Sequence, residues 1–198
     1  MIIWINGAFG SGKTSAAFEL HRRLPDSFVY DPENVGYFIR RNAPVEFSKG
    51  DFQDIPLWRE MNYKLIKLIT SQYSGNLIVP MTIVNPIYYD EIICKLRDDG
   101  IEIRHFILYA SKETILHRLR FRISRLFGGD TFAVRSIDRC INAFYNLITE
   151  DKIDTDNIGV DEVVNEIARR CGVALSLDKK TKFGRLLYRA GVLVRHIR

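Results

Sequence analysis

A glycine-rich segment near the start of the chain has the spacing of a phosphate-binding loop. Residues 7–14 read Gly-Ala-Phe-Gly-Ser-Gly-Lys-Thr, which fits the pattern GxxxxGK[ST]. Glycines let successive backbone N–H groups turn towards phosphate oxygens at the positive end of a following helix. In this pattern the lysine reaches the β and γ phosphates and the threonine hydroxyl binds Mg²⁺. We therefore expect a nucleotide site formed by Gly7, Ala8, Phe9, Gly10, Ser11, Gly12, Lys13 and Thr14.

Two motifs that mark other classes of nucleotide-binding protein are missing from the sequence. The chain has no NKxD, so guanine specificity of the GTPase kind is unsupported. The apolar run at 77–81 leads into Thr82 and the run at 103–108 into Tyr109, so neither ends in an acid. Motor and transporter ATPases hold Mg²⁺ and water through an acid at that place. This absence, together with the short chain, favours a small-molecule kinase.

Asp31 is the acid that the sequence places best for phosphoryl transfer. It follows the apolar residues 28–30 in a Tyr-Asp-Pro-Glu segment, and small P-loop kinases often take their acid from the end of the second strand. Ligands of open α/β sheets bind at that carboxyl edge. Asp31 would accept the proton of an acceptor hydroxyl or orient Mg²⁺ through water, and Glu33 could share this work. The alternative is a simple Asp-Pro turn with Glu33 as a helix cap.

Arginines on two predicted helices could stabilise a transferring phosphoryl group. Arg118 and Arg122 are four residues apart and share one helix face, which Arg125 extends, and Arg139 lies on the next helix. Guanidinium groups above a phosphoryl group stabilise its charge without a covalent role. A solvated basic face is the alternative. Three further arginines could bind an anionic or sugar substrate: Arg40, Arg41 and Arg59.

These residues need a sheet edge to position them, and the hydropathy pattern predicts one. Apolar runs at 2–5, 28–30, 77–81 and 103–108 do not alternate with polar residues and are each followed by a helical pattern, with a weaker strand near 152–155. Strands that alternate with helices form crossovers and a parallel sheet buried on both faces. We therefore expect an α/β fold, a P-loop NTPase of the nucleotide- and shikimate-kinase type, with a five-stranded parallel sheet covered by helices on both faces.

The chain is expected to form one domain with a helical lid and a separate basic tail. Its 198 residues, 46% hydrophobic and 27% charged, have the composition of one globular domain and exclude disordered, collagen-like and coiled-coil classes. Residues 1–177 would form the P-loop domain. Two helices, predicted at about 112–126 and 133–147, would be hinged by the glycines at 128 and 129 and form a lid over about 112–147.

The net charge of +5 lies almost wholly in residues 178–198. They hold seven of the 29 Lys and Arg residues and one of the 24 acids, which leaves 22 basic against 23 acidic residues in 1–177. From residue 183 on, apolar residues recur at helical steps opposite a basic face, which predicts an amphipathic helix. Such a helix could pack on the domain, lie on an anionic membrane or bind nucleic acid. Nucleic acid is the least favoured of the three.

Residue types that would mark other functions are few or scattered. Cys94, Cys140 and Cys171 are odd in number and far apart, which predicts free thiols in a reducing compartment. The four histidines show no ligand spacing, so the expected metal is Mg²⁺ that arrives with the nucleotide. The N-terminal apolar run is too short for a signal peptide, and no stretch approaches about 18 apolar residues. We therefore expect a cytoplasmic protein that neither spans a membrane nor is exported.

Segments over nearly the whole chain resemble one family. Trp-Ile-Asn-Gly-Ala-Phe-Gly-Ser-Gly-Lys-Thr at 4–14, Tyr-Asp-Pro-Glu at 30–33, Leu-Ile-Val-Pro-Met-Thr at 77–82 and Ala-Ser-Lys-Glu-Thr at 110–114 are similar to the tunicamycin resistance protein family. The resemblance implies an ATP-binding, P-loop kinase-like protein that protects the cell from tunicamycin, a nucleoside antibiotic made of uracil, sugars and a fatty acyl chain. It also implies peripheral association with the inner face of the cell membrane through the C-terminal amphipathic helix.

The resemblance also assigns roles to matching residues. Gly7, Gly12, Lys13 and Thr14 would contact the nucleotide, while Asp31 and the lid arginines stand where kinase-like relatives place catalytic groups. The expected reaction is ATP- and Mg²⁺-dependent phosphorylation of a hydroxyl on tunicamycin or a related uridine sugar, with Thr14 and Asp31 at the metal. Two alternatives remain open: sequestration of the drug at the membrane without chemistry, and a housekeeping kinase that acts on an ordinary metabolite.

Overall fold

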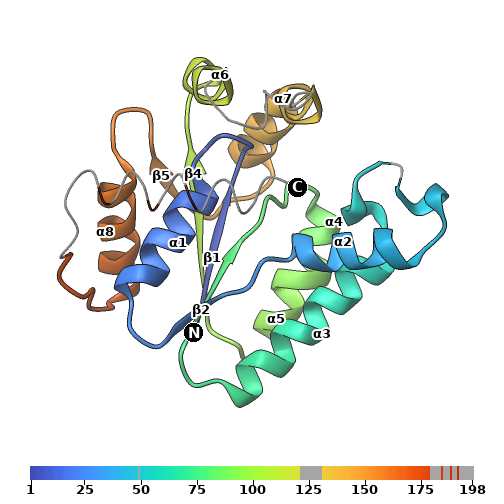
Figure 1. Ribbon diagram of the computed structural model, residues 1–198, viewed down its shortest axis with the longest axis horizontal. Coiled ribbons are helices and arrows are strands. Elements are labelled where there is room, and N and C mark those ends of the chain that lie inside the picture. Colours follow the sequence, from blue (N-terminus) through green and yellow to red (C-terminus); the bar gives the residue numbers. More distant parts are fainter. Residues whose placement is uncertain (49, 121–130, 179–183, 185–187, 189–190, 192–198) are drawn as a thin grey trace.

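A five-stranded parallel sheet forms the centre of the computed structural model, which describes residues 1–48, 50–120, 131–178, 184, 188 and 191 (Figure 1). Its strands are β1 (Ile2–Gly7), β2 (Ser27–Val29), β3 (Asn76–Pro80), β4 (Ile103–Tyr109) and β5 (Asp151–Asp154), in the order β2-β3-β1-β4-β5. The central strand β1 pairs Ile2 with Leu77 of β3 and with Ile103 of β4. The five predicted strands and their parallel arrangement are confirmed.

Helices cover both faces of this sheet. On one face lie α1 (Lys13–Arg23) and α8 (Val160–Cys171); on the other lie α2 (Glu33–Asn42), α3 (Pro56–Gln72) and α5 (Lys95–Asp98) (Figure 1). Short turns join the larger elements: η1 (Val45–Ser48) and η2 (Phe52–Asp54) lie between α2 and α3, and α4 (Pro86–Tyr89) and the π-helical η3 (Asp90–Cys94) lie between β3 and α5. The predicted α/β fold is therefore confirmed.

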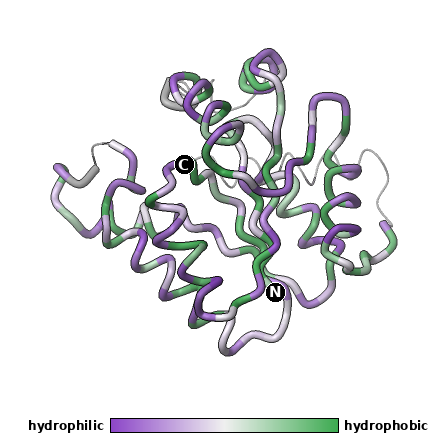
Figure 2. Tube along the Cα trace, turned by 180° about the vertical axis from the view of Figure 1, so that it is seen from behind, coloured by the Kyte–Doolittle hydropathy of each residue, from purple (hydrophilic) through white to green (hydrophobic). Residues whose placement is uncertain are grey.

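Alternation along the strands gives the sheet two apolar cores. Trp4 packs with Trp58 and Ile66 of α3 on one face, while its neighbour Ile3 packs with Leu20 of α1 and Ile167 of α8 on the other. Successive strand residues point to opposite faces, so a strand with a core on each side reads as a continuous apolar run. Figure 2 shows the same pattern, with hydrophobic residues along the central strands and hydrophilic residues on the outer sides of the helices.

Two further helices lie beyond the end of β4, at the top of the view in Figure 1. They are α6 (Lys112–Arg120) and α7 (Thr131–Asn146), and they enclose a third apolar cluster together with Ala8 of the glycine-rich loop. The predicted helices at 112–126 and 133–147 correspond to these two. Residues 121–130, which include Arg122, Arg125 and both glycines of the predicted hinge, lie outside the described residues.

The chain beyond α8 returns to α1. Ser176 N donates to the Arg23 carbonyl oxygen at 2.8 Å, and Arg22 pairs with Asp178 at 2.9 Å. In the basic tail, Gly184, Tyr188 and Gly191 have helical backbone, and the Tyr188 hydroxyl donates to the carbonyl oxygen of Phe18 at 3.4 Å. The rest of the predicted amphipathic helix is outside the described residues. Among the helices that are described, none is long and apolar enough to cross a membrane.

Candidate functional site

The glycine-rich loop runs from the end of β1 to the start of α1. Gly7 has a φ of +146°, and a Cβ there would lie 2.5 Å from Ser11 Oγ and 2.6 Å from the Leu108 carbonyl oxygen, so a side chain does not fit. The loop turns back on itself, with Ser11 N donating to the Ala8 carbonyl at 3.1 Å. Because α1 begins at Lys13, the loop ends at the positive end of that helix. Strand, loop and helix follow one another as predicted.

Lys13 and Thr14 are the first two residues of α1. Lys13 Nζ donates to the carbonyl oxygens of Gly7 and Ala8, both at 3.0 Å, and lies 5.5 Å from the centre of the Phe9 ring. The ammonium group is thus held across the loop. Thr14 is partly buried, and its hydroxyl has no hydrogen-bond partner within the part of the chain that the structure describes. This oxygen is available to a hard cation, so the site fits Mg²⁺.

Two polar residues that the sequence analysis did not assign to the site fasten the loop to the end of β3. Asn6 Nδ2 donates to the Ile83 carbonyl at 2.9 Å, and Asn6 Oδ1 accepts from Ile83 N at 3.0 Å and from Gly7 N at 2.8 Å. Thr82 Oγ1 donates to the Gly7 carbonyl at 2.8 Å. Both side chains are buried. The only signal for them in the sequence is their position: Asn6 directly precedes the loop, and Thr82 directly follows the apolar run at 77–81.

Asp31 follows β2 and lies at the carboxyl edge of the sheet, as expected. Its Oδ1 accepts from Glu33 N at 3.0 Å, so it also caps the turn that leads into α2. Burial, and secondarily the charge of Asp31, raises the pKa of the Tyr30 phenol, whose hydroxyl donates to Asn62 Oδ1 at 2.7 Å. Glu33 accepts from the Tyr37 hydroxyl at 3.4 Å. Asp31 therefore forms the Asp-Pro turn of the alternative interpretation, and it does so at the edge of the sheet where ligands of such folds bind.

Arg118, a predicted lid arginine, is held by the loop after β5. Its Nη1 donates to Thr155 Oγ1 at 3.0 Å and its Nη2 to the Thr155 carbonyl, while Thr155 Oγ1 donates to the Tyr109 carbonyl at 2.9 Å. The next residue on the helix, Leu119, packs on the glycine-rich loop, since a Cβ on Gly10 would lie 3.1 Å from Leu119 Cγ. The described part of α6 is therefore fixed between the loop and β5.

Arg139, the predicted arginine of α7, faces an acid that the sequence analysis did not identify. Its Nη2 lies 3.9 Å from Asp51 Oδ2, in the segment between α2 and α3. Burial raises the pKa of the Asp51 carboxyl, although the charges of Arg139 and Arg40 oppose this. Burial also raises the pKa of the Cys140 thiol, which the charges of Lys13 and Arg139 lower. Arg139 and Asp51 thus form an ion pair beside α7, and the charge of Lys13 acts on the neighbouring residue of the same helix, Cys140.

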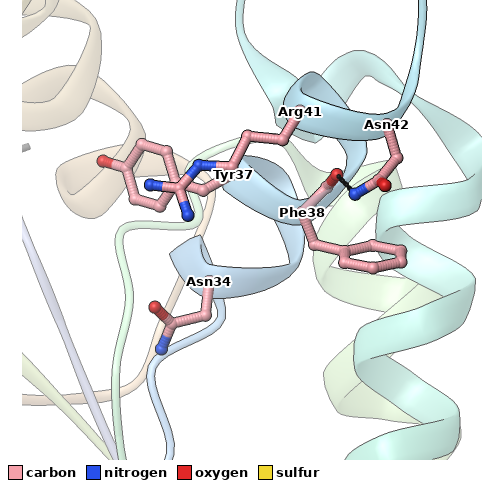
Figure 3. Close-up of a pocket in the computed structure, with 5 residues that line it drawn as sticks. All are labelled: Asn34, Tyr37, Phe38, Arg41 and Asn42. Atoms are coloured by element: carbon pink, nitrogen blue, oxygen red, sulfur yellow. Dashed lines mark hydrogen bonds between the residues drawn. The ribbon is translucent and has the colours of Figure 1, made fainter.

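The three other candidate arginines differ in their surroundings. Arg40 Nη2 donates to the Gly50 carbonyl at 2.7 Å, and Arg59 donates to the Gln53 carbonyl at 2.6 Å and pairs with Glu91, so both hold the segment between α2 and α3. Arg41 is exposed and lies beside an open hollow of about 410 Å³ on α2 (Figure 3). The hollow is lined by Asn34, Tyr37, Phe38, Arg41 and Asn42.

Known proteins match this chain in sequence and in fold. The AAA domain family matches residues 2–136. The tunicamycin resistance protein of Deinococcus radiodurans is 31% identical, with a TM-score of 0.73, over 89% of this chain and 99% of that chain. A sugar kinase from Janibacter sp. is 15% identical, with a TM-score of 0.59, over 87% of this chain and 95% of that chain. Comparison with curated protein sequences gave no match.

A second kinase structure has a similar fold. The APS kinase of Mycobacterium tuberculosis, in complex with AMPPNP and APS, is 17% identical, with a TM-score of 0.61, over 86% of this chain and 96% of that chain. At these low identities the two kinases share the fold with this chain. The fold is therefore that of nucleotide-binding P-loop kinases.

Proposed function

The chain belongs to the AAA domain family and to the tunicamycin resistance proteins, and we propose that it is an ATP- and Mg²⁺-dependent phosphotransferase. Its proposed acceptor is a hydroxyl group of tunicamycin or of a related uridine sugar. The observation that carries the proposal is the glycine-rich loop, with Lys13 Nζ held across it by two carbonyl oxygens, in the fold of P-loop kinases. The proposed reaction takes place at the carboxyl edge of the sheet, where this loop, Asp31 and α7 lie.

In this proposal the loop binds the phosphates of ATP. Its backbone N–H groups and the Lys13 ammonium contact the β and γ phosphates. The hydroxyl of Thr14, and Asp31 through water, hold Mg²⁺, which neutralises phosphate charge when it is bound. The proposal is supported by the Thr14 hydroxyl, which has no partner among the described residues, and by the buried contacts of Asn6 and Thr82 that keep the loop in place.

The proposed chemistry transfers one phosphoryl group. The acceptor hydroxyl oxygen attacks the γ-phosphorus, the bond from this phosphorus to the β,γ-bridging oxygen breaks, and ADP leaves. The hydroxyl proton passes to the Asp31 carboxylate, which acts as the general base. In this proposal Arg118 of α6 and Arg139 of α7 stabilise the charge on the transferred group, with Arg122 as a third lid arginine.

The lid and the tail complete the proposal. Residues 1–177 form the kinase domain, α6 and α7 belong to a lid over about 112–147, and residues 178–198 form a basic helix that contacts an anionic membrane peripherally. The lid is supported by the contact of Leu119 with Gly10, which places α6 directly on the phosphate loop. The Arg22–Asp178 ion pair ties the base of the tail to α1.

Mass spectrometry of tunicamycin after incubation with purified protein, ATP and Mg²⁺ tests this function. The expected product carries the mass of one added phosphoryl group and is absent with Lys13→Ala, which removes the phosphate-binding ammonium group. If the drug co-purifies with the unmutated protein but is not modified, the kinase proposal is wrong and ATP-dependent sequestration of the drug is the function. Phosphorylation of a common nucleoside or sugar, with no reaction of the drug, would identify a housekeeping kinase instead.

A further inference from the structure

The segment between α2 and α3 holds Asp51 in a fixed position. The Phe52 ring packs so closely on α2 that a Cβ on Gly36 would lie 2.6 Å from it, and its centre is 5.3 Å from the centre of the Trp58 ring. On either side of Asp51, the carbonyl oxygens of residues 50 and 53 accept hydrogen bonds from the guanidinium groups of Arg40 and Arg59. This segment is therefore built to keep the Asp51 carboxylate at one place.

Asp51 and the phosphate loop both lie beside α7. The buried side of α7 packs on Ala8, with Cys140 and Phe9 in the same cluster. Arg139 precedes Cys140 on this helix, and its Nη2 is 3.9 Å from Asp51 Oδ2. The Cys140 thiol lies in the electrostatic field of Lys13 as well as of Arg139 and Asp51. Asp51 and the phosphate loop therefore lie beside the same helix, in which Arg139 and Cys140 are consecutive residues.

The two oxygens of this carboxylate differ in their hydrogen bonding. Oδ1 accepts from Gln53 N at 3.0 Å, which leaves Oδ2 with no hydrogen bond among the residues described, since 3.9 Å to Arg139 is too long for one. The Asp51 side chain is only 15% exposed, and burial raises its pKa. Oδ2 is the accessible oxygen of a side chain that is otherwise largely buried, so it can accept a hydrogen bond from a ligand, and the low local polarity strengthens a hydrogen bond to the charged oxygen.

We infer that Asp51 is an acceptor-binding residue, whose Oδ2 accepts a hydrogen bond from a hydroxyl or N–H group of the acceptor beside Arg139. The inference rests on the proposed function and narrows its substrate class. The part of the acceptor that meets Asp51 is a hydrogen-bond donor without negative charge, such as a sugar hydroxyl, because a carboxylate or phosphate there would be repelled. The Arg139 side chain is 58% exposed, so its guanidinium has further N–H groups that can bind the transferred phosphoryl group.

Calorimetric titration of the full chain with tunicamycin, in the presence of AMPPNP and Mg²⁺, tests this role. Asp51→Asn keeps the shape of the side chain and removes its charge. We expect it to weaken tunicamycin binding by about ten- to a hundredfold, the loss of a hydrogen bond to a charged group, and to leave AMPPNP binding within about twofold of the unmutated protein. The matched control is Glu46→Gln, which neutralises an exposed acid of the same segment and should change neither affinity.

The outcomes separate this inference from the function on which it rests. If Asp51→Asn binds tunicamycin as tightly as the unmutated protein, the role of Asp51 is wrong and the kinase proposal is unaffected. If the unmutated protein binds AMPPNP but neither binds nor phosphorylates tunicamycin, the proposed acceptor is wrong and the inference fails with it. A purely structural Asp51 would lower the urea midpoint of Asp51→Asn and weaken both ligands equally, which also overturns the inference.

Discussion

Thr82 Oγ1 donates a hydrogen bond of 2.8 Å to the carbonyl oxygen of Gly7, and so connects the end of β3 to the first residue of the phosphate loop. The same carbonyl oxygen accepts from Lys13 Nζ at 3.0 Å. A neutral hydroxyl therefore stands at the strand end where motor and transporter ATPases place an acid, and it holds the backbone carbonyl group that also binds the lysine. The contact of Thr82 gives this loop a support that does not depend on a charge.

Replacement of Thr82 should loosen the loop. Thr82→Val keeps the branched shape but removes the donor, so we expect the free energy of unfolding to fall by about 1 kcal/mol and nucleotide binding to weaken. Urea unfolding and titration with AMPPNP measure the two effects. Thr82→Ser retains the hydroxyl and is the control. A Thr82→Val protein that matches the unmutated chain in both measurements would show that this hydrogen bond does not support the loop.

Gly7 should tolerate no side chain. A Cβ there meets the Leu108 carbonyl oxygen at 2.6 Å, and backbone at this φ is already strained for other residues. Strain of this kind costs about 1–3 kcal/mol, so Gly7→Ala should lose at least that much stability and also lose AMPPNP binding, because the loop must shift. Gly100 has a φ of +79° and open space around its Cα. Gly100→Ala should therefore lose stability through backbone strain alone and keep its affinity for AMPPNP. Equal AMPPNP affinity of the Gly7→Ala and Gly100→Ala variants would contradict this prediction.

Arg118 should act on the rate rather than on binding. The two hydrogen bonds to Thr155 fix its guanidinium after β5, and in the proposed reaction an arginine on the transferred group acts mainly in the transition state. We expect Arg118→Ala to lower kcat by about a hundredfold or more with a small change in the KM for ATP. Arg120 is exposed on the same helix, so Arg120→Ala is the matched control in the same kinase assay. A loss of equal size in both variants would mean that the helix, and not the guanidinium of Arg118, is affected.

The fold could be predicted from the sequence because its main features are local. Residues 2–5 are buried on both faces of the sheet and form a continuous apolar run, and 103–108 are buried except for Arg104 at the start of β4. The eight residues of the phosphate loop are consecutive, so their pattern is complete in the sequence itself. The weaker strand near 152–155 also formed, as β5 (Asp151–Asp154), although most of its residues are exposed.

The rest of the site depends on contacts between distant segments. Asp51 lies in an irregular segment, and only the fold brings it to Arg139. Arg59 looks like a binding arginine in the sequence, yet its partners are the Gln53 carbonyl and Glu91. A local pattern records that an arginine is present but not whether a carbonyl oxygen or a ligand faces it. For the same reason the sequence does not show that Thr155 is the hydrogen-bond partner of Arg118, because the two residues are 37 positions apart and meet only in the fold.

His105 should make the stability of the protein sensitive to acid. Its ring is buried on β4 against Trp4 and Tyr89, with centroid distances of 6.2 and 5.7 Å, and neither ring nitrogen has a hydrogen-bond partner among the described residues. Burial lowers the pKa of His105 to about 3, from 6.5 in an unfolded chain, although Glu150 at 3.9 Å raises it. The unfolded chain therefore binds more protons between these pH values. The stability supplied by a neutral His105 is complete above pH 6.5 and is lost as the pH falls below it.

Urea unfolding between pH 7.5 and about 5 measures this effect. We expect the free energy of unfolding to fall by at most about 1.4 kcal/mol per pH unit below pH 6.5. The range stops near pH 5 because hydrogen bonds lower the pKa of Glu150 against the effect of burial, so its own contribution is lost only at more acidic pH. His105→Phe keeps a ring between Trp4 and Tyr89 and cannot titrate. The slope should therefore flatten in this variant; an unchanged slope would assign the acid sensitivity to other groups.

The basic tail should bind anionic membranes independently of the nucleotide site. It carries seven Lys and Arg residues against one acid, and each basic residue near such a surface contributes about 1 kcal/mol. Deletion of residues 178–198 should therefore abolish sedimentation with liposomes that contain anionic lipid and leave AMPPNP affinity unchanged. The described contacts of this region with α1, the Arg22–Asp178 pair and the Tyr188 hydroxyl on the Phe18 carbonyl, lie away from the phosphate loop.

The control separates membrane binding from packing on the domain. Tyr188→Phe removes the hydrogen bond to Phe18 and keeps every basic residue of the tail, so it should bind anionic liposomes at least as well as the full chain and lose binding equally at high salt. A truncated chain that still binds these liposomes would assign the contact to another surface. If the full chain does not bind them at all, and deletion of the tail instead lowers the free energy of unfolding, the tail serves to pack on α1.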